Sequence, residues 1–115
     1  MSEITARRIA GLATRAFDDD AYGKVYDKAS GAMKDVIPRG SFDITADEKT
    51  GQRWFWFRCP GPCGSITAIA LRPVVGVGIN QSWEFDGNED APTLKPSINH
   101  GGCWHGWLTN GIFKE

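Results

Sequence analysis

The pattern of hydrophobic and polar positions changes at about residue 40. Before that point, apolar residues such as Ile4, Ile9 and Leu12 recur with the spacing of a helix face. The polar run Asp18–Asp20 suits the end of this helix and the cap of a second, weaker helix from Ala21 to about Val36. The pattern therefore predicts one or two N-terminal helices.

The rest of the chain has the signals of β-strands and turns. A polar turn is expected at Asp47–Gly51, and Asn110-Gly111 between apolar runs is the strongest hairpin signal. Two prolines in Pro92–Ile98 indicate an edge strand or an extended rim, because proline cannot donate to a sheet. The predicted strands cover residues 41–45, 52–58, 65–73, 82–85, 92–98, 104–108 and 112–114.

Together these elements predict an α+β fold. Residues 1–40 form the helical segment, and residues 41–115 form a compact, antiparallel β-rich domain. A chain of 115 residues is one small domain, in which the helices pack on the sheet or trail from it. Such a chain buries a modest core, so a bound metal would add usefully to its stability.

The β-rich part also holds all five tryptophans. In Gln52–Arg58, indole rings alternate with phenyl rings, so both faces of this strand are apolar. Five tryptophans exceed what so small a core needs, and tryptophan is favoured in recognition surfaces. We therefore expect an aromatic binding surface formed by Trp54, Trp56, Trp83, Trp104 and Trp107.

Charge and targeting signals narrow the class of protein. The formal net charge of -1 gives no overall attraction to nucleic acid or to anionic membranes. The apolar runs are too short to span a membrane, and the N-terminus lacks the apolar core of a signal peptide. Three cysteines is an odd number, which suits a disulfide framework poorly. We expect a soluble protein of a reducing cytoplasm.

All three cysteines and one of the two histidines lie in two short motifs. Cys59 and Cys63 enclose two prolines and a glycine, a rigid turn that can aim both sulfurs to one side. Cys103 and His105 are two residues apart and would project from the same face of an extended segment. Three thiolates and one imidazole form a closed tetrahedral zinc set. We predict a structural, zinc-knuckle-like site made by these four residues.

Several alternatives to this ligand set remain open. His100 is a competing nitrogen ligand in a glycine-rich loop. The three thiols can instead be inert buried side chains, as free cysteines often are. A disulfide between Cys59 and Cys63 would need an oxidising compartment. Cys103 and His105 can also be interpreted as a nucleophile and its base.

Other polar residues give weaker signals. Asp86, Glu89 and Asp90 are close enough in sequence for acid–base chemistry or cation binding, but a polar turn after a strand is the commoner explanation. Lys95 and Ser97 suggest a Ser-Lys pair. A proline lies between them and nothing else in the sequence supports such a pair.

Several motifs in the second half of the chain match those of a known family. The matching segments are Phe57–Pro60, Cys63-Gly64, Trp83–Gly87, Ala91–Ile98, Cys103–Trp107 and Asn110-Gly111. They resemble a family of small proteins of unknown function from phages, prophages and bacterial genomes, some of which are labelled ammonia monooxygenase. Similar proteins appear beside bacterial ubiquitin-like conjugation genes. The resemblance implies that Cys59, Cys63, Cys103 and His105 act as a group.

A monooxygenase centre built on copper or iron needs several histidine or carboxylate ligands, and the whole chain has two histidines. We therefore favour a non-enzymatic phage or prophage accessory protein, a zinc-stabilised module that binds a host or phage protein through its aromatic surface. The alternative is a small zinc-dependent hydrolase with Asp86, Glu89 or His100 around an open metal. Single-strand nucleic-acid binding by tryptophan stacking is a weaker alternative.

Overall fold

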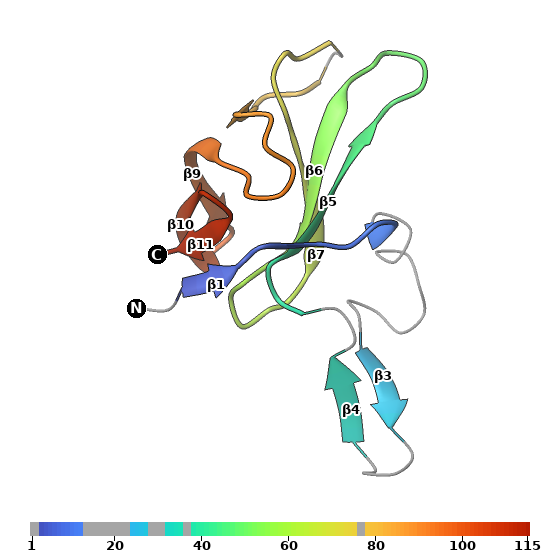
Figure 1. The fold of residues 1–115 in the computed structure, drawn as a ribbon, viewed down its shortest axis with the longest axis vertical. Helices are drawn as coiled ribbons and strands as arrows, with labels where there is room; N and C mark the ends of the chain where they lie inside the picture. Colours follow the sequence, from blue (N-terminus) through green and yellow to red (C-terminus); the bar gives the residue numbers. More distant parts are fainter. Residues whose placement is uncertain (1–2, 13–23, 28–31, 36–37, 76–77) are drawn as a thin grey trace.

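The described part of the chain is built from β-strands (Figure 1). The computed structural model describes residues 3–12, 24–27, 32–35, 38–75 and 78–115. The strands are β1 (Glu3–Thr5), β2 (Arg7–Arg8), β3 (Lys24–Asp27), β4 (Ala32–Asp35), β5 (Ser41–Ala46), β6 (Arg53–Arg58), β7 (Ile66–Ala70), β8 (Glu84–Phe85), β9 (Leu94–His100), β10 (Trp104–Thr109) and β11 (Ile112–Lys114).

The predicted α+β fold is wrong, because no helix is among the elements of the described residues. In the expected first helix, β1 pairs with β11 and β2 pairs in parallel with β5. In the expected second helix, β3 and β4 pair as antiparallel strands. Residues 13–17 of the first expected helix, and residues 21–23, 28–31 and 36 of the second, lie outside the described residues. Helix propensity is a weak local preference, and here the sheet edges of β11 and β5 supply pairing partners that override it.

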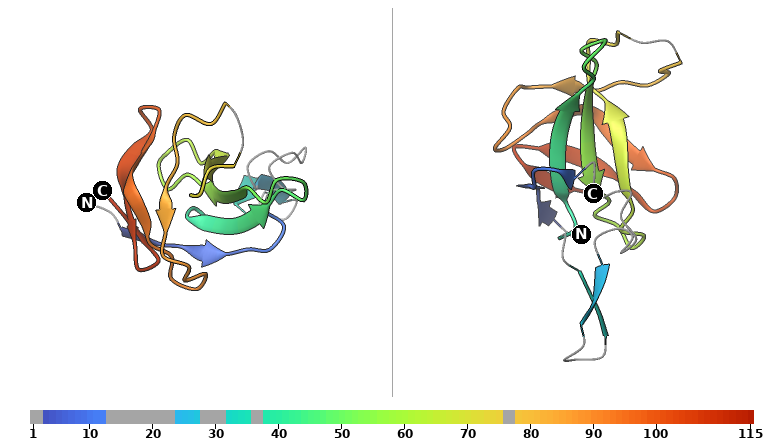
Figure 2. Two further views of the ribbon diagram at one scale, coloured as in Figure 1. Left: turned by 90° about the horizontal axis from the view of Figure 1, so that it is seen from above. Right: turned by 90° about the vertical axis from the view of Figure 1, so that its right-hand side faces the viewer.

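Two sheets form the body of the protein. One has five strands in the order β1-β11-β10-β9-β8, and the other has four in the order β2-β5-β6-β7. Viewed from above in the left panel of Figure 2, the orange and red strands of the first sheet lie beside the green strands of the second. The blue N-terminal segment runs from one sheet to the other, so β1 and β2 tie the two layers together.

The core lies between the two sheets. Phe42 stacks on Phe55 at a ring-centroid distance of 5.2 Å within the four-stranded sheet. Phe57 then stacks on Phe113 of the five-stranded sheet at 5.8 Å. Other buried members of the core are Ala6, Cys59, Leu71, Trp83, Leu94, Ile98, Trp104 and Leu108. Burial of these aromatic and aliphatic side chains drives the two sheets together.

The strand predictions after residue 40 are largely confirmed. β6 is an inner strand of its sheet, between β5 and β7, and its Phe55 and Phe57 face the core. The Asp47–Gly51 turn is closed by Asp47 Oδ1, which accepts hydrogen bonds from the backbone N–H groups of Lys49 and Thr50. The Asn110-Gly111 hairpin joins β10 to β11, and both residues have the positive φ that this turn requires.

β9 is the strand that carries most of the polar chemistry described below. It pairs with β10 on one side, with an irregular register between Gly106 and Leu108, and with β8 at Leu94 and Lys95 on the other. β9 is therefore an inner strand, and the edge strand predicted for Pro92–Ile98 is wrong. The sequence of β9 continues past Pro96 to His100, at the tip of the β9–β10 hairpin.

No helix in the described part of the chain is long and apolar enough to cross a membrane.

Candidate functional site

Four side chains with metal-binding atoms meet where the β6–β7 loop touches the tip of the β9–β10 hairpin. They are Cys59, Cys63, His100 and Cys103, and their ligand atoms all lie within 4.8 Å of one another. The Sγ atoms of Cys59 and Cys103 are 3.6 Å apart, and Cys63 Sγ is 3.6 Å from His100 Nδ1. All three cysteines are free thiols. This group can hold a metal ion.

The loop from Cys59 to Gly64 is shaped to present its sulfurs. The backbone N–H of Gly61 points to Cys59 Sγ at 3.4 Å, and the N–H of Cys63 points to Cys103 Sγ at 3.2 Å. A Cβ at Gly61 would lie 2.8 Å from both Cys103 Sγ and the Cys103 carbonyl oxygen. The loop therefore approaches the hairpin so closely that only glycine fits at this point.

Two arginine side chains donate hydrogen bonds to backbone carbonyls of this loop. The buried Arg58 side chain donates from Nε to the Gly64 carbonyl at 2.9 Å. Arg39 donates from its guanidinium to the Gly61 carbonyl. The loop is thus fixed at two of its carbonyl groups, which limits the positions that the sulfurs of Cys59 and Cys63 can take.

The thiols of Cys59 and Cys63 have pKa values shifted in opposite directions. Burial raises the pKa of Cys59 to about 12, against the opposing hydrogen bond from the backbone of Gly61. At Cys63 burial also opposes ionisation, but hydrogen bonds from the Cys103 side chain and the Ser65 backbone outweigh it and lower the pKa to about 6. One thiol thus ionises near neutral pH beside another that keeps its proton. A bound cation would favour release of that proton, because metals bind the thiolate form.

The imidazole in this group belongs to His100, the alternative that the sequence left open. His100 also packs its ring edge against Phe57 of the core, at a centroid distance of 6.4 Å. The Cys103 N–H donates to the His100 carbonyl at 2.8 Å, which closes the tight turn between these two residues. His105 lies outside the group, on the exposed face of β10.

His105 instead meets a serine. Its Nε2 lies 3.2 Å from the Oγ of Ser97, which comes from the neighbouring strand β9. The two residues are brought together by the register of the β9–β10 hairpin, in which His105 is opposite Asn99. A serine hydroxyl within hydrogen-bond reach of an imidazole nitrogen is the arrangement of a nucleophile and its general base.

A polar hollow of about 430 Å³ lies beside Ser97. Its walls include Asn80, Gln81, Ser82 and Asn99. The indole N–H of Trp83, which also lines this hollow, donates to the Ser97 carbonyl at 3.3 Å. The Ser97 backbone is thereby held beside the hollow, and Ser97 is one of the residues that line it.

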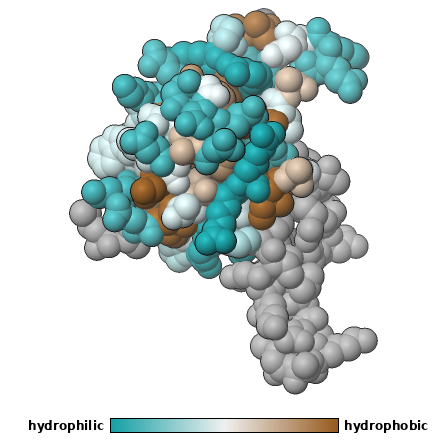
Figure 3. Space-filling model, viewed as in Figure 1, coloured by the Kyte–Doolittle hydropathy of each residue, from teal (hydrophilic) through white to brown (hydrophobic). Residues whose placement is uncertain are grey.

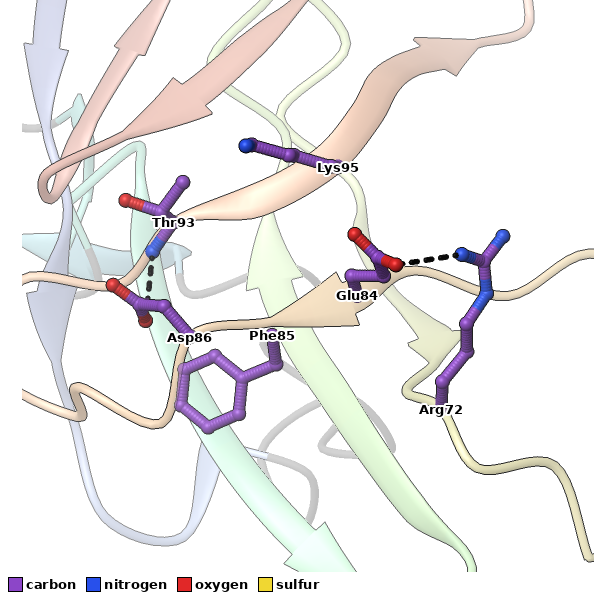
Figure 4. A pocket seen from close by; sticks show the side chains of 6 residues that line it. All are labelled: Arg72, Glu84, Phe85, Asp86, Thr93 and Lys95. Carbon is purple, nitrogen blue, oxygen red and sulfur yellow. Dashed lines mark hydrogen bonds and ion pairs between the residues drawn. The ribbon is translucent and has the colours of Figure 1, made fainter.

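Lys95 does not form the Ser-Lys pair that the sequence suggested. It lines a separate hollow of about 380 Å³ on the β8 side of the sheet (Figure 4). In the same hollow, Glu84 pairs with Arg72 at 3.5 Å, and Asp86 Oδ1 accepts from the Thr93 N–H at 3.2 Å (Figure 4).

The acidic residues in the turn after β8 have structural partners as well. Asp86 also accepts from the Asn88 N–H at 3.0 Å, and Glu89 pairs with Arg8 at 3.0 Å. The Asp90 N–H donates to the Asn88 side chain at 3.0 Å. These contacts account for the acidic cluster as a polar turn, and they give no support to the zinc-hydrolase alternative.

The five tryptophans do not share one exposed face. Trp83 and Trp104 are buried, whereas Trp54 and Trp56 are partly buried on the four-stranded sheet. Trp107 is 52% exposed, and its ring stacks on His105 at a centroid distance of 5.9 Å. The coloured part of the face in Figure 3 is mainly hydrophilic, with small separate hydrophobic areas.

Ser97 is a candidate site residue that sequence reasoning set aside. A signal was available, because the outward positions of one strand include Ser97 and those of another include His105. Pairing them required the hairpin register, and the sequence between Ile98 and Trp104 has no turn motif that fixes it as sharply as Asn110-Gly111 does.

In the described residues, the fold and the site define a protein of β-sheets with a Cys/His group at the tip of the β9–β10 hairpin and a serine–histidine pair on the same hairpin. Residues 29–115 match the model of the family described as bacterial ubiquitination-like system serine protease (BubE), and the chain belongs to that family. No curated protein and no solved structure is significantly similar to the chain. The family is bacterial by its description, so the phage or prophage origin stays a prediction.

Proposed function

We propose that this protein is a serine protease in which Ser97 is the nucleophile and His105 is the general base. The observation that carries the proposal is the 3.2 Å separation of Ser97 Oγ and His105 Nε2 on the exposed face of the five-stranded sheet. The description of the family as a serine protease supports it. The polar hollow beside Ser97 provides room for the acyl part of a substrate.

The chemistry follows from this geometry. Ser97 Oγ attacks the carbonyl carbon of the scissile amide while His105 Nε2 takes the hydroxyl proton. The C–N bond then breaks, and the departing amine leaves with the proton from His105. Water next attacks the acyl ester, His105 takes a proton from it, and Ser97 regains its hydrogen as the acid product leaves. For Nε2 to accept a proton, the other ring nitrogen, Nδ1, carries the imidazole hydrogen.

We further propose that Cys59, Cys63, His100 and Cys103 hold a structural zinc ion. Tetrahedral zinc with Zn–S bonds of about 2.3 Å places two sulfur ligands about 3.8 Å apart. The Sγ atoms of Cys59 and Cys103 are 3.6 Å apart, which is close to that distance. Three thiols and one imidazole fill all four positions of such a site. The ion would pin the tip of the β9–β10 hairpin, and this hairpin carries both Ser97 and His105.

The serine assignment can be tested with diisopropyl fluorophosphate, which forms a covalent adduct with activated serines. We expect one adduct per wild-type chain, located on Ser97 by peptide mass spectrometry. Ser97→Ala abolishes the adduct. His105→Ala slows its formation at least about 10³-fold, because the hydroxyl loses its base.

Lys95→Ala is the control, since it removes the only competing base that the sequence suggested. It should label at the wild-type rate. An adduct that persists in Ser97→Ala, or a labelling rate that depends on Lys95 and not on His105, would rule out the proposed pair.

A protein partner and a cytoplasmic location remain predictions from the sequence. The proposed activity gives the partner a defined chemical role, because the polypeptide that is cleaved must reach the exposed face of the five-stranded sheet. Single-strand nucleic-acid binding has less support, since only one of the five tryptophans is widely exposed.

A further inference from the structure

The outer face of the five-stranded sheet continues well beyond the serine–histidine pair. Along β10, exposed residues alternate with buried ones, so His105 and Trp107 point outward while Trp104 and Leu108 point to the core. On the next strand, β11, Ile112 is 37% exposed and Phe113 is buried. Trp107 and Ile112 are therefore large apolar side chains on the same face as the proposed catalytic pair.

A second hollow lies over β10 and β11, on the side of Trp107 and Ile112. It has a volume of about 450 Å³, and its walls include Trp107, Thr109, Ile112 and Lys114. Trp107 connects it to the site, because the indole ring stacks on the His105 imidazole with an interplanar angle of 27°. The strand order places the proposed catalytic pair between this hollow, on β10 and β11, and the polar hollow beside β9.

The direction of the substrate follows from the role of the base. The histidine of a serine protease first takes the serine proton and then gives it to the departing amine, so the leaving group must lie on the histidine side of the serine. Here the histidine side is the side of Trp107 and Ile112. The acyl side is then the polar hollow lined by Asn80, Gln81 and Asn99.

We propose that the hollow formed by Trp107 and Ile112 is the subsite for the leaving group, and that it takes an apolar side chain just after the scissile bond. This inference rests on the proposed function and adds a substrate preference to it. The occupant is a peptide segment with an aliphatic or aromatic residue, since such a side chain would cover the exposed indole of Trp107 and the exposed sec-butyl group of Ile112. Trp107 is the main specificity-determining residue.

Acyl transfer to an added amine tests this subsite without knowledge of the natural substrate. p-Nitrophenyl acetate would acetylate Ser97 and release p-nitrophenol. The acetyl enzyme then partitions between leucinamide and glycinamide at equal concentrations. In this step the amine nitrogen forms a bond to the acetyl carbon, the C–O bond to Ser97 breaks, and His105 takes one amine proton and passes it to the departing Ser97 oxygen.

The ratio of N-acetyl-leucinamide to N-acetylglycinamide, measured by mass spectrometry, reports the subsite independently of the overall rate. We expect the wild type to favour leucinamide about tenfold, as burial of one aliphatic side chain allows. Trp107→Ala and Ile112→Ser bring the ratio towards that of the uncatalysed reaction, and Trp107→Phe retains most of it. The control Val75→Ala changes an apolar side chain that is 50% exposed outside this hollow, and it should leave the ratio unchanged.

The results separate the two proposals. If diisopropyl fluorophosphate labels Ser97 but the wild type shows no preference for leucinamide, the subsite is disproved and the serine protease is not. The same holds if the preference survives both Trp107→Ala and Ile112→Ser. If Ser97 is neither labelled nor acetylated, both proposals fail.

Discussion

At the scale of single residues, the metal-binding group depends on a glycine. Gly61 lies between Cys59 and Cys63, and its backbone passes close to Cys103. The absence of a side chain there lets the loop bring its two sulfurs within reach of the hairpin. The pKa values of the two thiols differ for separate reasons: burial raises the pKa of Cys59, whereas at the exposed Cys63 burial is outweighed by hydrogen bonds from Cys103 and Ser65, which lower the pKa.

Gly61→Ala should weaken the group. The added methyl would meet Cys103 at 2.8 Å, so the loop or the hairpin tip must shift. We expect a loss of about 1–3 kcal/mol in the free energy of unfolding, the usual cost of overpacking, together with a lower zinc content. Chemical denaturation and elemental mass spectrometry measure the two effects. Pro62→Ala alters an exposed position in the same loop and is the matched control; equal stability of the two variants would argue against the close contact.

The different pKa values predict an order of alkylation. In metal-free protein at pH 7, Cys63 should react first with iodoacetamide, because its pKa of about 6 makes it largely thiolate. Cys59 should react last, since its pKa of about 12 and its burial both oppose reaction. Peptide mass spectrometry over time gives the order. Zinc-loaded protein should protect all three cysteines, and faster labelling of Cys59 than of Cys63 would contradict the assignment.

At the scale of the elements, the β9–β10 hairpin joins two kinds of site. Its tip provides His100 and Cys103 to the metal-binding group, and its outer face provides Ser97 and His105. The tip is fixed to the four-stranded sheet through the Cys59–Gly64 loop. Disturbance of the metal-binding group would therefore shift the serine relative to its base without removing either residue.

Removal of the metal should accordingly slow the labelling of Ser97 by diisopropyl fluorophosphate. Displacement of a catalytic pair by about 1 Å can cost about 10²-fold in rate, and we expect a loss of that order after chelation. Reconstitution with Cd²⁺, which also binds thiolates tetrahedrally, should restore the rate as well as Zn²⁺ does if the ion is structural. A rate that follows the identity of the metal would instead indicate that the ion takes part in the chemistry.

At the scale of the whole molecule, the N-terminal segment is an integral part of the fold. β1 extends the five-stranded sheet beyond β11, and β2 extends the other sheet beyond β5. Between them the Ala6 N–H donates to the Gly111 carbonyl at 2.8 Å, and the Ala6 side chain is buried in the core. The segment thus crosses from one layer to the other and clamps both.

Deletion of residues 1–8 should destabilise the protein strongly. The deletion removes several backbone hydrogen bonds and the buried Ala6 side chain. We expect a decrease on the order of 3 kcal/mol in the free energy of unfolding. Chemical denaturation of the truncated chain gives the value. Glu3→Gln, which keeps the strand and changes only an exposed charge, is the control. If the truncated chain is as stable as this variant, residues 1–8 do not contribute to the stability of the fold.

The fold was predictable where local patterns agree with tertiary pairing. Alternation in residues 53–58 and the Asn110-Gly111 turn each specify their structure within a few residues. The N-terminal prediction failed because strands as short as β1 and β2 have no periodicity of their own. They exist through hydrogen bonds to partners that lie 33 or more residues away, such as Ser41 opposite Arg7.

The sequence by itself determined the chemistry available to this protein: three thiols in two motifs, two imidazoles and a run of β-strands. Only the tertiary structure decided which imidazole joins the thiols. Cys103 lies in the hairpin turn and not in an extended strand, so the same-face argument did not apply to it, and the turn brings His100 inward. His105 is thereby left on the outer face beside Ser97. Such a meeting across a hairpin depends on strand register, which is set by the packing of both sheets and not by neighbouring residues alone.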